Sequence, residues 1–310
     1  MLLGRLPAAT WSVLEEIRLR ATRPLILGSA AGETMLTAEG STTSDPGSAY
    51  RVNEEDVART VELVTGSSLY AVEDELRQGF VTVSGGHRVG LCGRAVVEGG
   101  RVRTLKYLSG VNFRVSREVH GAADQVLPWL LRGTRGIYNT LIISPPRCGK
   151  TTLLRDFVRQ ISDGVPHLGC TGLAVGVVDE RSEIAGCYRG IPQRDVGIRT
   201  DVLDGCPKAE GMMMLLRALS PEVIATDEIG RREDVEALEE MLNAGVNIVA
   251  TAHAASVEEL RGRPVLRELL GRQIVERFII LEYRHGPGVV RAVVDGRTFQ
   301  AVGGTPRCSK

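Results

Sequence analysis

The sequence predicts an α/β protein with two domains, a smaller α+β domain followed by a domain built on a mainly parallel sheet. Two patterns predict it. The first 120 residues mix helical and strand-like segments with Gly-rich turns, whereas apolar strands alternate with helices in the second half. A chain of 310 residues is also long enough for two cores. We expect domains at 1–120 and 136–300, a linker helix and connection at 121–135 and a tail at 301–310.

The first domain is expected to open with a helix at 9–18 and a strand at 24–28. A clear helix follows Asn53, which is placed to cap it, with Asp56 at the capping-box position. Strand-like residues at 80–97, followed by a Gly-Gly turn, then predict a hairpin. These elements together indicate a compact α+β domain.

The second domain alternates apolar strands with helices, as expected of a parallel sheet wrapped by helices. A turn with the sequence HGPG separates the last two strand-like runs and predicts a hairpin that extends the sheet. In chain order we expect a strand at 140–144, a helix at 150–161, a strand at 173–179, a helix at 209–218, a strand at 222–227, a helix at 232–243, a strand at 246–251 and hairpin strands at 277–283 and 289–294.

The composition is that of an ordinary globular protein. The 38 Lys and Arg residues balance 38 Asp and Glu residues, which argues against a dedicated nucleic-acid binder. The six cysteines form no CxxC pair and stand at no zinc-ligand spacing, so neither a disulfide framework nor a structural metal is expected. No apolar run approaches the roughly 20 residues of a membrane helix, and no signal peptide is evident, so we expect a cytoplasmic protein without membrane insertion.

The strongest local signal is SPPRCGKTT at 144–152, where a strand enters a Pro/Gly loop that leads into a helix. Backbone N–H groups and a helix N-terminus then face one small volume, which suits phosphate. Lys150 is expected to reach the terminal phosphates, Thr151 to bind Mg²⁺ and Thr152 to contact the α-phosphate. Ser144 stands where the GxxxxGK[ST] pattern has a glycine that permits unusual dihedrals. The predicted nucleotide-binding residues are Ser144, Pro145, Pro146, Arg147, Cys148, Gly149, Lys150, Thr151 and Thr152.

A second signal is PEVIATDEIG at 221–230, an apolar strand that ends in two acids. Because successive side chains of a strand point opposite ways, Asp227 and Glu228 can take different tasks: Asp227 holds Mg²⁺ and Glu228 polarises the attacking water. The alternative for the acids at 227–228 is a solvated strand end, and the alternative for the loop at 144–152 is an exposed turn before an ordinary helix. Each alternative loses weight because the two motifs occur together.

Two further strand ends carry polar candidates. VVDERSEIAG places Asp179, Glu180 and Glu183 at the carboxyl edge of the sheet, where open α/β folds bind ligands. Glu180 and Glu183 are therefore candidates for metal or water contacts, against the alternative of a charged loop. His253, which follows another apolar run, is either a sensor of the γ-phosphate or a hydrogen-bonded structural residue.

Arginines suit the charge that develops on a reacting phosphate, and the sequence does not choose among them. Most arginines make surface or interdomain contacts, and that alternative applies to each of them. The candidates are Arg114, Arg117, Arg181, Arg199, Arg217, Arg231 and Arg232.

The order of these motifs, loop, acidic strand end, Asp-Glu pair and histidine, resembles the Walker A, Asp box, Walker B and His box of the secretion-superfamily ATPases of type II and type IV secretion and of pilus motors. Across nearly the whole chain, five segments also resemble the stage III sporulation protein AA family, whose loop has a serine where Ser144 stands. The segments are EIRLRATRPL (16–25), GGHRVGLCGR (85–94), NFRVSREV (112–119), ISPPRCGKTTLLRD (143–156) and SPEVIATDEIG (220–230).

The resemblance implies a RecA-like P-loop NTPase domain that takes ATP and Mg²⁺, in a ring of AAA+ type formed by six copies of the chain. The N-terminal domain then closes over the nucleotide, and Arg114 or Arg117 reaches it. The implied partner is the membrane-embedded channel between mother cell and forespore in endospore formation, with the ATPase docked on its mother-cell face.

Three functions stay open: an ATP-hydrolysing oligomeric motor, a nucleotide-responsive protein that binds single-stranded nucleic acid, and an ATP-binding scaffold without useful turnover. The basic, Gly-rich segment GGHRVGLCGR favours the second, but an aromatic content of 4% leaves few platforms for base stacking. The motor leads because catalysis by positioning and charge neutralisation around Mg²⁺ accounts for both nucleotide motifs.

Overall fold

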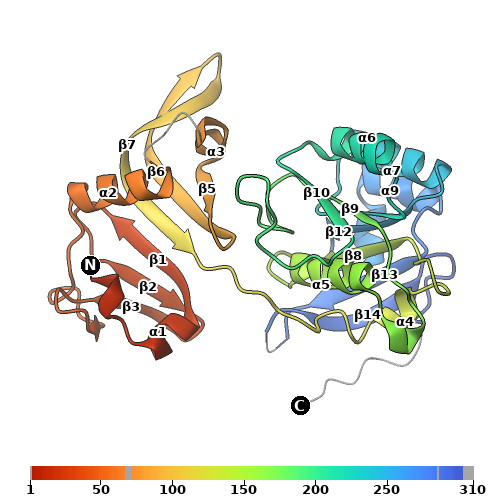
Figure 1. The fold of residues 1–310 in the computed structure, drawn as a ribbon, viewed down its shortest axis with the longest axis horizontal. Coiled ribbons are helices and arrows are strands. Elements are labelled where there is room, and N and C mark those ends of the chain that lie inside the picture. The colour runs from red at the N-terminus through yellow and green to blue at the C-terminus, as the bar shows by residue number, and fades with distance from the viewer. Residues whose placement is uncertain (1, 67–71, 285, 303–310) are drawn as a thin grey trace. The chain divides into compact units, whose positions relative to one another are not determined.

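The computed structural model describes residues 2–66, 72–284 and 286–302, so of the predicted tail only its first two residues are included. The chain forms two compact units, Met1–Arg117 and Glu118–Lys310. Each unit has its own seven-stranded sheet (Figure 1). Residues 121–135 belong to the second unit, where Ala123, Val126 and Leu130 are fully buried.

The N-terminal unit is an antiparallel sheet with the strand order β4-β3-β2-β1-β7-β6-β5, against which helices pack. Its elements are the 3-10 helix Leu3–Arg5, α1 (Ala8–Val13), β1 (Leu14–Arg20), β2 (Ile26–Ser29), β3 (Gly32–Leu36), β4 (Thr42–Thr43), α2 (Glu54–Val64), α3 (Glu73–Gln78), β5 (Phe80–Val83), β6 (His87–Glu98) and β7 (Arg101–Arg114).

The capping box predicted for α2 is confirmed. The Asp56 backbone N–H donates to Asn53 Oδ1 at 2.8 Å, and the Asn53 N–H donates to Asp56 Oδ2 at 3.0 Å. These bonds satisfy donors that the first turn of a helix leaves free. The predicted hairpin is also present, as β6 and β7 joined at Gly99-Gly100.

The helix predicted at 9–18 is wrong in its second half. Helix α1 ends at Val13, and the following residues form β1, which pairs with both β2 and β7. Ile17 and Leu19 are buried at alternate positions while Arg18 and Arg20 are less so, which is the period of a strand rather than of a helix. Tertiary pairing therefore decides this segment.

The second unit has the strand order β10-β9-β11-β12-β8-β13-β14, parallel throughout except for the antiparallel β13–β14 hairpin, as predicted. Strand β10 and helices α8 and α9 were not predicted. The elements are α4 (Leu127–Leu130), β8 (Thr140–Ser144), α5 (Lys150–Asp163), the 3-10 helix Pro166–Leu168, β9 (Val175–Asp179), β10 (Thr200–Asp204), α6 (Lys208–Leu219), β11 (Val223–Thr226), α7 (Arg232–Asn243), β12 (Asn247–His253), α8 (Val257–Arg261), α9 (Pro264–Gly271), β13 (Arg277–Glu282) and β14 (Val289–Asp295).

Helices cover both faces of this second sheet. On β8, Ile142 packs into the core on the α5 side, whereas Leu141 and Ile143 pack into the core under α6, α7 and α9. Figure 1 shows α5 on one side of the strands and α6 and α7 on the other. A strand buried on both faces reads as a continuous apolar run, which is why TLIIS was recognisable in the sequence.

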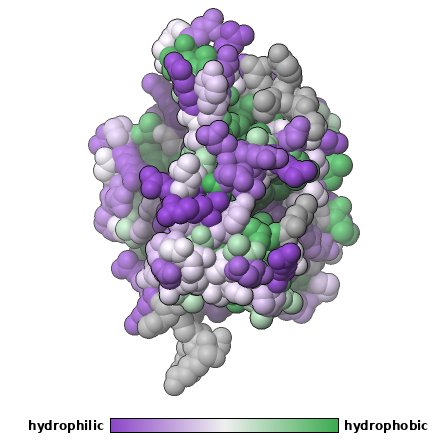
Figure 2. Space-filling view, turned by 90° about the vertical axis from the view of Figure 1, so that its left-hand side faces the viewer, coloured by the Kyte–Doolittle hydropathy of each residue, from purple (hydrophilic) through white to green (hydrophobic). Residues whose placement is uncertain are grey.

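Within the residues that the structure describes, no helix is both long and apolar enough to cross a bilayer. In the view of Figure 2, hydrophilic residues cover most of the visible face and hydrophobic ones are scattered among them.

Candidate nucleotide-binding site

The predicted polar residues meet at one edge of the second sheet. Strands β9, β11, β12 and β8 are parallel neighbours, so their carboxyl ends lie along the same edge. Asp179 ends β9, Asp227 and Glu228 follow β11, His253 ends β12 and Ser144 ends β8. Ligands of open α/β folds bind at such an edge.

In the loop between β8 and α5, the position that requires a glycine is Gly149 and not Ser144. Ser144 pairs with His253 as the last residue of its strand, whereas Gly149 has a φ of 88° and Arg147 a φ of 62°. A Cβ at Gly149 would lie 3.0 Å from the Gly288 nitrogen and 3.1 Å from its Cα. A glycine is therefore needed at 149 for both conformation and space, while an extended serine is accommodated at 144.

Lys150 begins α5 and turns its amine into the loop. The side chain is 5% exposed, and Nζ lies 3.2 Å from Ser144 O, Ser144 Oγ and Pro145 O, and 3.1 Å from His253 Nδ1. Burial lowers the pKa of Lys150, and the negative charge of Glu228 opposes that shift. The amine is thus held among acceptors at the mouth of a helix N-terminus.

Glu228 lies at the centre of a chain of contacts. Its Oε1 is 2.8 Å from His253 Nε2, and its Oε2 accepts a hydrogen bond of 2.6 Å from Arg181. The Glu228 backbone N–H donates to Thr251 Oγ1 at 2.8 Å, and its φ of 46° is in the left-handed region. Burial would raise the pKa of Glu228, but the hydrogen bond with His253 and the charge of Arg181 outweigh it and lower the pKa. A carboxylate held ionised suits a group that polarises water.

Asp227 is fully buried, and neither of its carboxylate oxygens has a hydrogen-bond partner among the described residues. Burial raises the pKa of Asp227 to about 7, the charge of Asp179 adds to the shift and Lys208 opposes it. A buried carboxylate without partners is costly unless a cation or proton joins it. Asp227 and the hydroxyl-bearing Thr151 at the start of α5 therefore fit the residues that would hold Mg²⁺ beside phosphates.

The Asp179 carboxylate binds the backbone of the loop that follows β9. Although burial raises the pKa of Asp179, its oxygens accept hydrogen bonds of 2.8, 3.0 and 2.8 Å from the backbone N–H groups of Glu183, Ile184 and Ala185. Arg155 of α5 donates to the Glu183 carbonyl at 2.6 Å and also to that of Ile184. The loop is therefore fastened both to its strand and to the helix that follows the phosphate loop.

Glu180 and Glu183 differ in their surroundings. Glu180 forms an ion pair with the buried Lys208 and lies 3.8 Å from Arg231. Glu183 is partly buried, and its charge contributes to the raised pKa of Asp227. Their catalytic roles stay predictions.

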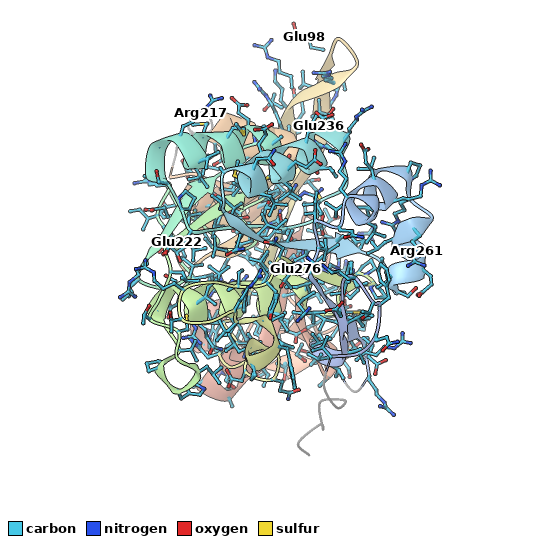
Figure 3. The ribbon with its side chains drawn as sticks, turned by 90° about the vertical axis from the view of Figure 1, so that its right-hand side faces the viewer. Glu98, Arg217, Glu222, Glu236, Arg261 and Glu276 are labelled. Carbon is cyan, nitrogen blue, oxygen red and sulfur yellow. The ribbon has the colours of Figure 1, made fainter. Side chains whose placement is uncertain are left out.

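The seven candidate arginines are spread over both units. Arg181 contacts Glu228 directly. Arg117 donates to the carbonyls of Ser12, Trp11 and Leu14 inside the N-terminal unit, and Arg114 ends β7 there. Arg199 donates to the Ser162 carbonyl, Arg232 pairs with Glu236, and Arg217 is exposed on α6 (Figure 3).

Two residues of the site were missed by sequence reasoning. Thr251 Oγ1 accepts a hydrogen bond from the Glu228 backbone N–H. Its position two residues before His253, near the end of a strand, could have indicated a place in the site. Lys208 is 6% exposed beside Glu180, and nothing in its sequence neighbourhood indicates burial. Only the packing of α6 against β9 reveals it.

Comparison with known proteins adds a family and a fold. Residues 3–301 match the family described as sporulation stage III, protein AA. Stage III sporulation protein AA of Bacillus subtilis (strain 168) is 42% identical over 308 residues, which span 99% of this chain and 95% of that protein. Among solved structures, the Legionella pneumophila ATPase DotB matches with a TM-score of 0.53 and 16% identity, over 88% of this chain and 73% of that one. The pilus retraction motor PilT with bound ADP matches with a TM-score of 0.56 and 14% identity, over 88% and 75%.

At these identities the solved structures show the fold alone. They confirm the predicted α/β fold: a RecA-like domain with a mainly parallel sheet follows a smaller α+β domain. The AAA+ assignment is corrected, because secretion and pilus ATPases form a class separate from AAA+ proteins.

Proposed function

We propose a function for this chain on one premise: it belongs to the stage III sporulation protein AA family. The chain is an ATPase that hydrolyses ATP to ADP and phosphate, works as a ring, most simply a hexamer, and drives a secretion-like channel in endospore formation. It docks from the cytoplasmic, mother-cell side onto membrane-embedded channel components.

One observation carries the ATPase proposal: contacts connect Lys150 through His253 to Glu228, and the adjacent Asp227 carboxylate has no hydrogen-bond partner among the described residues. In P-loop enzymes the lysine neutralises terminal phosphates and an acid orients the attacking water, so both tasks are available within one group of touching side chains. If a γ-phosphate binds the Lys150 amine, the contact between Lys150 and His253 is lost. Because His253 also contacts Glu228, that loss changes the surroundings of Glu228, which supports a sensor role for His253.

Mg²⁺, when bound, supplies charge neutralisation on the phosphate oxygens. Thr151 and Asp227 are its proposed protein ligands, and Mg²⁺ in nucleotide sites ordinarily takes only one or two carboxylates, with water and phosphates completing its shell. Glu228 holds the water and accepts its proton. Glu180 and Glu183 are proposed to support the same water, and Arg114 and Arg117 stay proposed contacts of the nucleotide.

The test is phosphate release by the purified full-length chain over a range of protein concentrations. Activity per protein is expected to rise as the chain assembles, and Glu228→Gln is expected to lower kcat by at least about 100-fold while MgATP still binds. Glu236→Gln is the matched control, because Glu236 is exposed on α7 and pairs only with Arg232 among its recorded contacts in the described chain (Figure 3). Full activity in a monomer contradicts the motor. Tight ATP binding without phosphate release, even with channel components present, favours the scaffold instead.

A further inference from the structure

The β6–β7 hairpin continues as a two-stranded ribbon, residues 92–109, beyond the rest of the N-terminal sheet. Strand β5 pairs with β6 only at 87–90, and β1 pairs with β7 only at 110–114. The ribbon therefore has no third strand beside it in the described chain, and Figure 1 shows it running out from the sheet of its own unit. No residue of the ribbon is buried. Its side chains are thus available to a partner.

One face of the ribbon is fixed to the N-terminal unit. Leu105 packs against the core of that unit, and Arg77 of α3 donates to the Arg103 carbonyl at 3.1 Å. Successive side chains of a strand point to opposite faces, so Lys106 faces away from Leu105, and Arg94 lies directly opposite Lys106 on the neighbouring strand. The outer face of the ribbon therefore carries two cations side by side.

The ribbon is basic, and most of its cations lack an acidic partner. It holds four cations against one acid, a net charge of +3, in a chain whose net charge is zero. Glu98 pairs with Arg103 at 2.7 Å, whereas Arg94, Arg101 and Lys106 are exposed and take part in no ion pair within the described residues. Like charges directly opposite each other destabilise a strand pair, as Arg94 and Lys106 do here. An anionic partner relieves that repulsion.

The outer end of the ribbon is apolar as well as basic. Val97 and Val102 pair across the two strands just before the turn, and they are 60% and 41% exposed. Their neighbour Glu98 marks this end in Figure 3, and Tyr107 on β7 is 79% exposed. Nucleic acid can neutralise the cations but offers aliphatic side chains no apolar medium. A bilayer with anionic headgroups offers both, and tyrosine is enriched at its interface.

We propose that the ribbon binds the surface of an anionic lipid bilayer, with Val97 and Val102 entering the interface and Arg94, Arg101 and Lys106 lying among the lipid phosphates. The contact is peripheral, because two valines are far too few to span a bilayer. Each cation near an anionic membrane surface strengthens binding about fivefold. The proposal goes beyond the ATPase function and does not rest on it.

The test is co-sedimentation of the full chain with vesicles of phosphatidylcholine alone and with vesicles of equal parts phosphatidylcholine and phosphatidylglycerol. The wild type is expected to bind only the anionic vesicles. Arg94→Gln combined with Lys106→Gln is expected to weaken this binding about 25-fold, and Val97→Ser combined with Val102→Ser at least about fivefold.

The matched control is Arg23→Gln combined with Arg59→Gln. Both residues are exposed in the same unit outside the ribbon, so the control removes the same charge and is expected to bind within about twofold of the wild type. Unchanged unfolding midpoints are expected for the three double variants. Equal losses in the control and in the variant of Arg94 and Lys106 would reveal only an effect of net charge and overturn the proposal.

Other results also overturn the proposal. One is a wild type that binds both kinds of vesicle equally, or neither. Another is a single-stranded oligonucleotide that displaces the vesicles and loses affinity in the variant of Arg94 and Lys106, which makes nucleic acid the partner of the ribbon. A third is a change in the mass of the assembly by light scattering in that variant, which makes a second copy of the chain the partner. Phosphate release measured without lipid is expected to be equal in all variants, so a failure of lipid binding leaves the ATPase proposal standing.

Discussion

Replacing Asp227 with asparagine is expected to stabilise the nucleotide-free, metal-free protein above pH 7 and to remove its response to Mg²⁺. Asp227 is fully buried, both of its oxygens lack partners in the described chain, and burial followed by repulsion from Asp179 raises its pKa to about 7. In the unfolded chain the same carboxyl ionises near its ordinary pKa of 3.8. Folding therefore costs free energy wherever the carboxyl must be ionised inside the protein.

The sign and size follow from proton linkage. Between about pH 4 and pH 7 the unfolded state has lost this proton and the folded state keeps it, so the free energy of unfolding falls as pH rises through that window and the cost is constant above pH 7. At 1.36 kcal/mol for each unit of pKa shift, the full cost is about 4 kcal/mol. Burying the asparagine amide without a hydrogen-bond partner also costs free energy, which offsets part of this gain. We therefore expect Asp227→Asn to raise the free energy of unfolding by about 1 to 3 kcal/mol at pH 8.

The assay is urea unfolding, followed by the signal of the second unit, at pH 5 and pH 8 with and without MgATP. The advantage of Asp227→Asn is expected to grow with pH, and stabilisation by MgATP is expected only in the wild type. Asp179→Asn is the control, because Asp179 accepts three backbone hydrogen bonds and an amide cannot accept them all, so it is expected to lose about 2 kcal/mol or more. The reasoning is refuted if Asp227→Asn is less stable than the wild type at pH 8, or if both variants behave alike.

Two further changes test the phosphate loop and the N-terminal core. Ser144→Ala removes one of the acceptors that hold Lys150 Nζ, so MgATP is expected to bind about three- to tenfold more tightly in calorimetry, and unchanged or weaker binding would contradict this. Asn53→Ala removes the acceptor for the Asp56 N–H at the start of α2. It is expected to lower the free energy of unfolding of the N-terminal unit by about 1 kcal/mol. Thr60→Ala, a change within the same helix but away from its cap, is measured for comparison.

Fold prediction succeeded where local pattern and tertiary role agree. The strands TLIIS and VIAT are buried on both faces, so their apolar runs were visible without any partner. It failed at 14–18, where pairing with β2 and β7 imposes a strand on a segment that follows a short helix. It also missed β10, whose residues are partly exposed at the edge of the sheet and therefore show no apolar run.

The sequence by itself determined the chemical groups of the site and their order along the chain, because a phosphate loop and acids at strand ends are local patterns with a local physical reason. It also pointed to the serine at 144 as a departure, although only the structure shows that the left-handed backbone falls on Arg147 and Gly149. Only the tertiary structure decided which carboxylates of the site already have hydrogen-bond or ion-pair partners. Asp179 accepts hydrogen bonds from three backbone N–H groups and Glu180 pairs with Lys208, whereas the buried Asp227 carboxylate has no hydrogen-bond partner within the described part of the chain. Such differences arise from contacts between residues far apart in the chain, which no local pattern records.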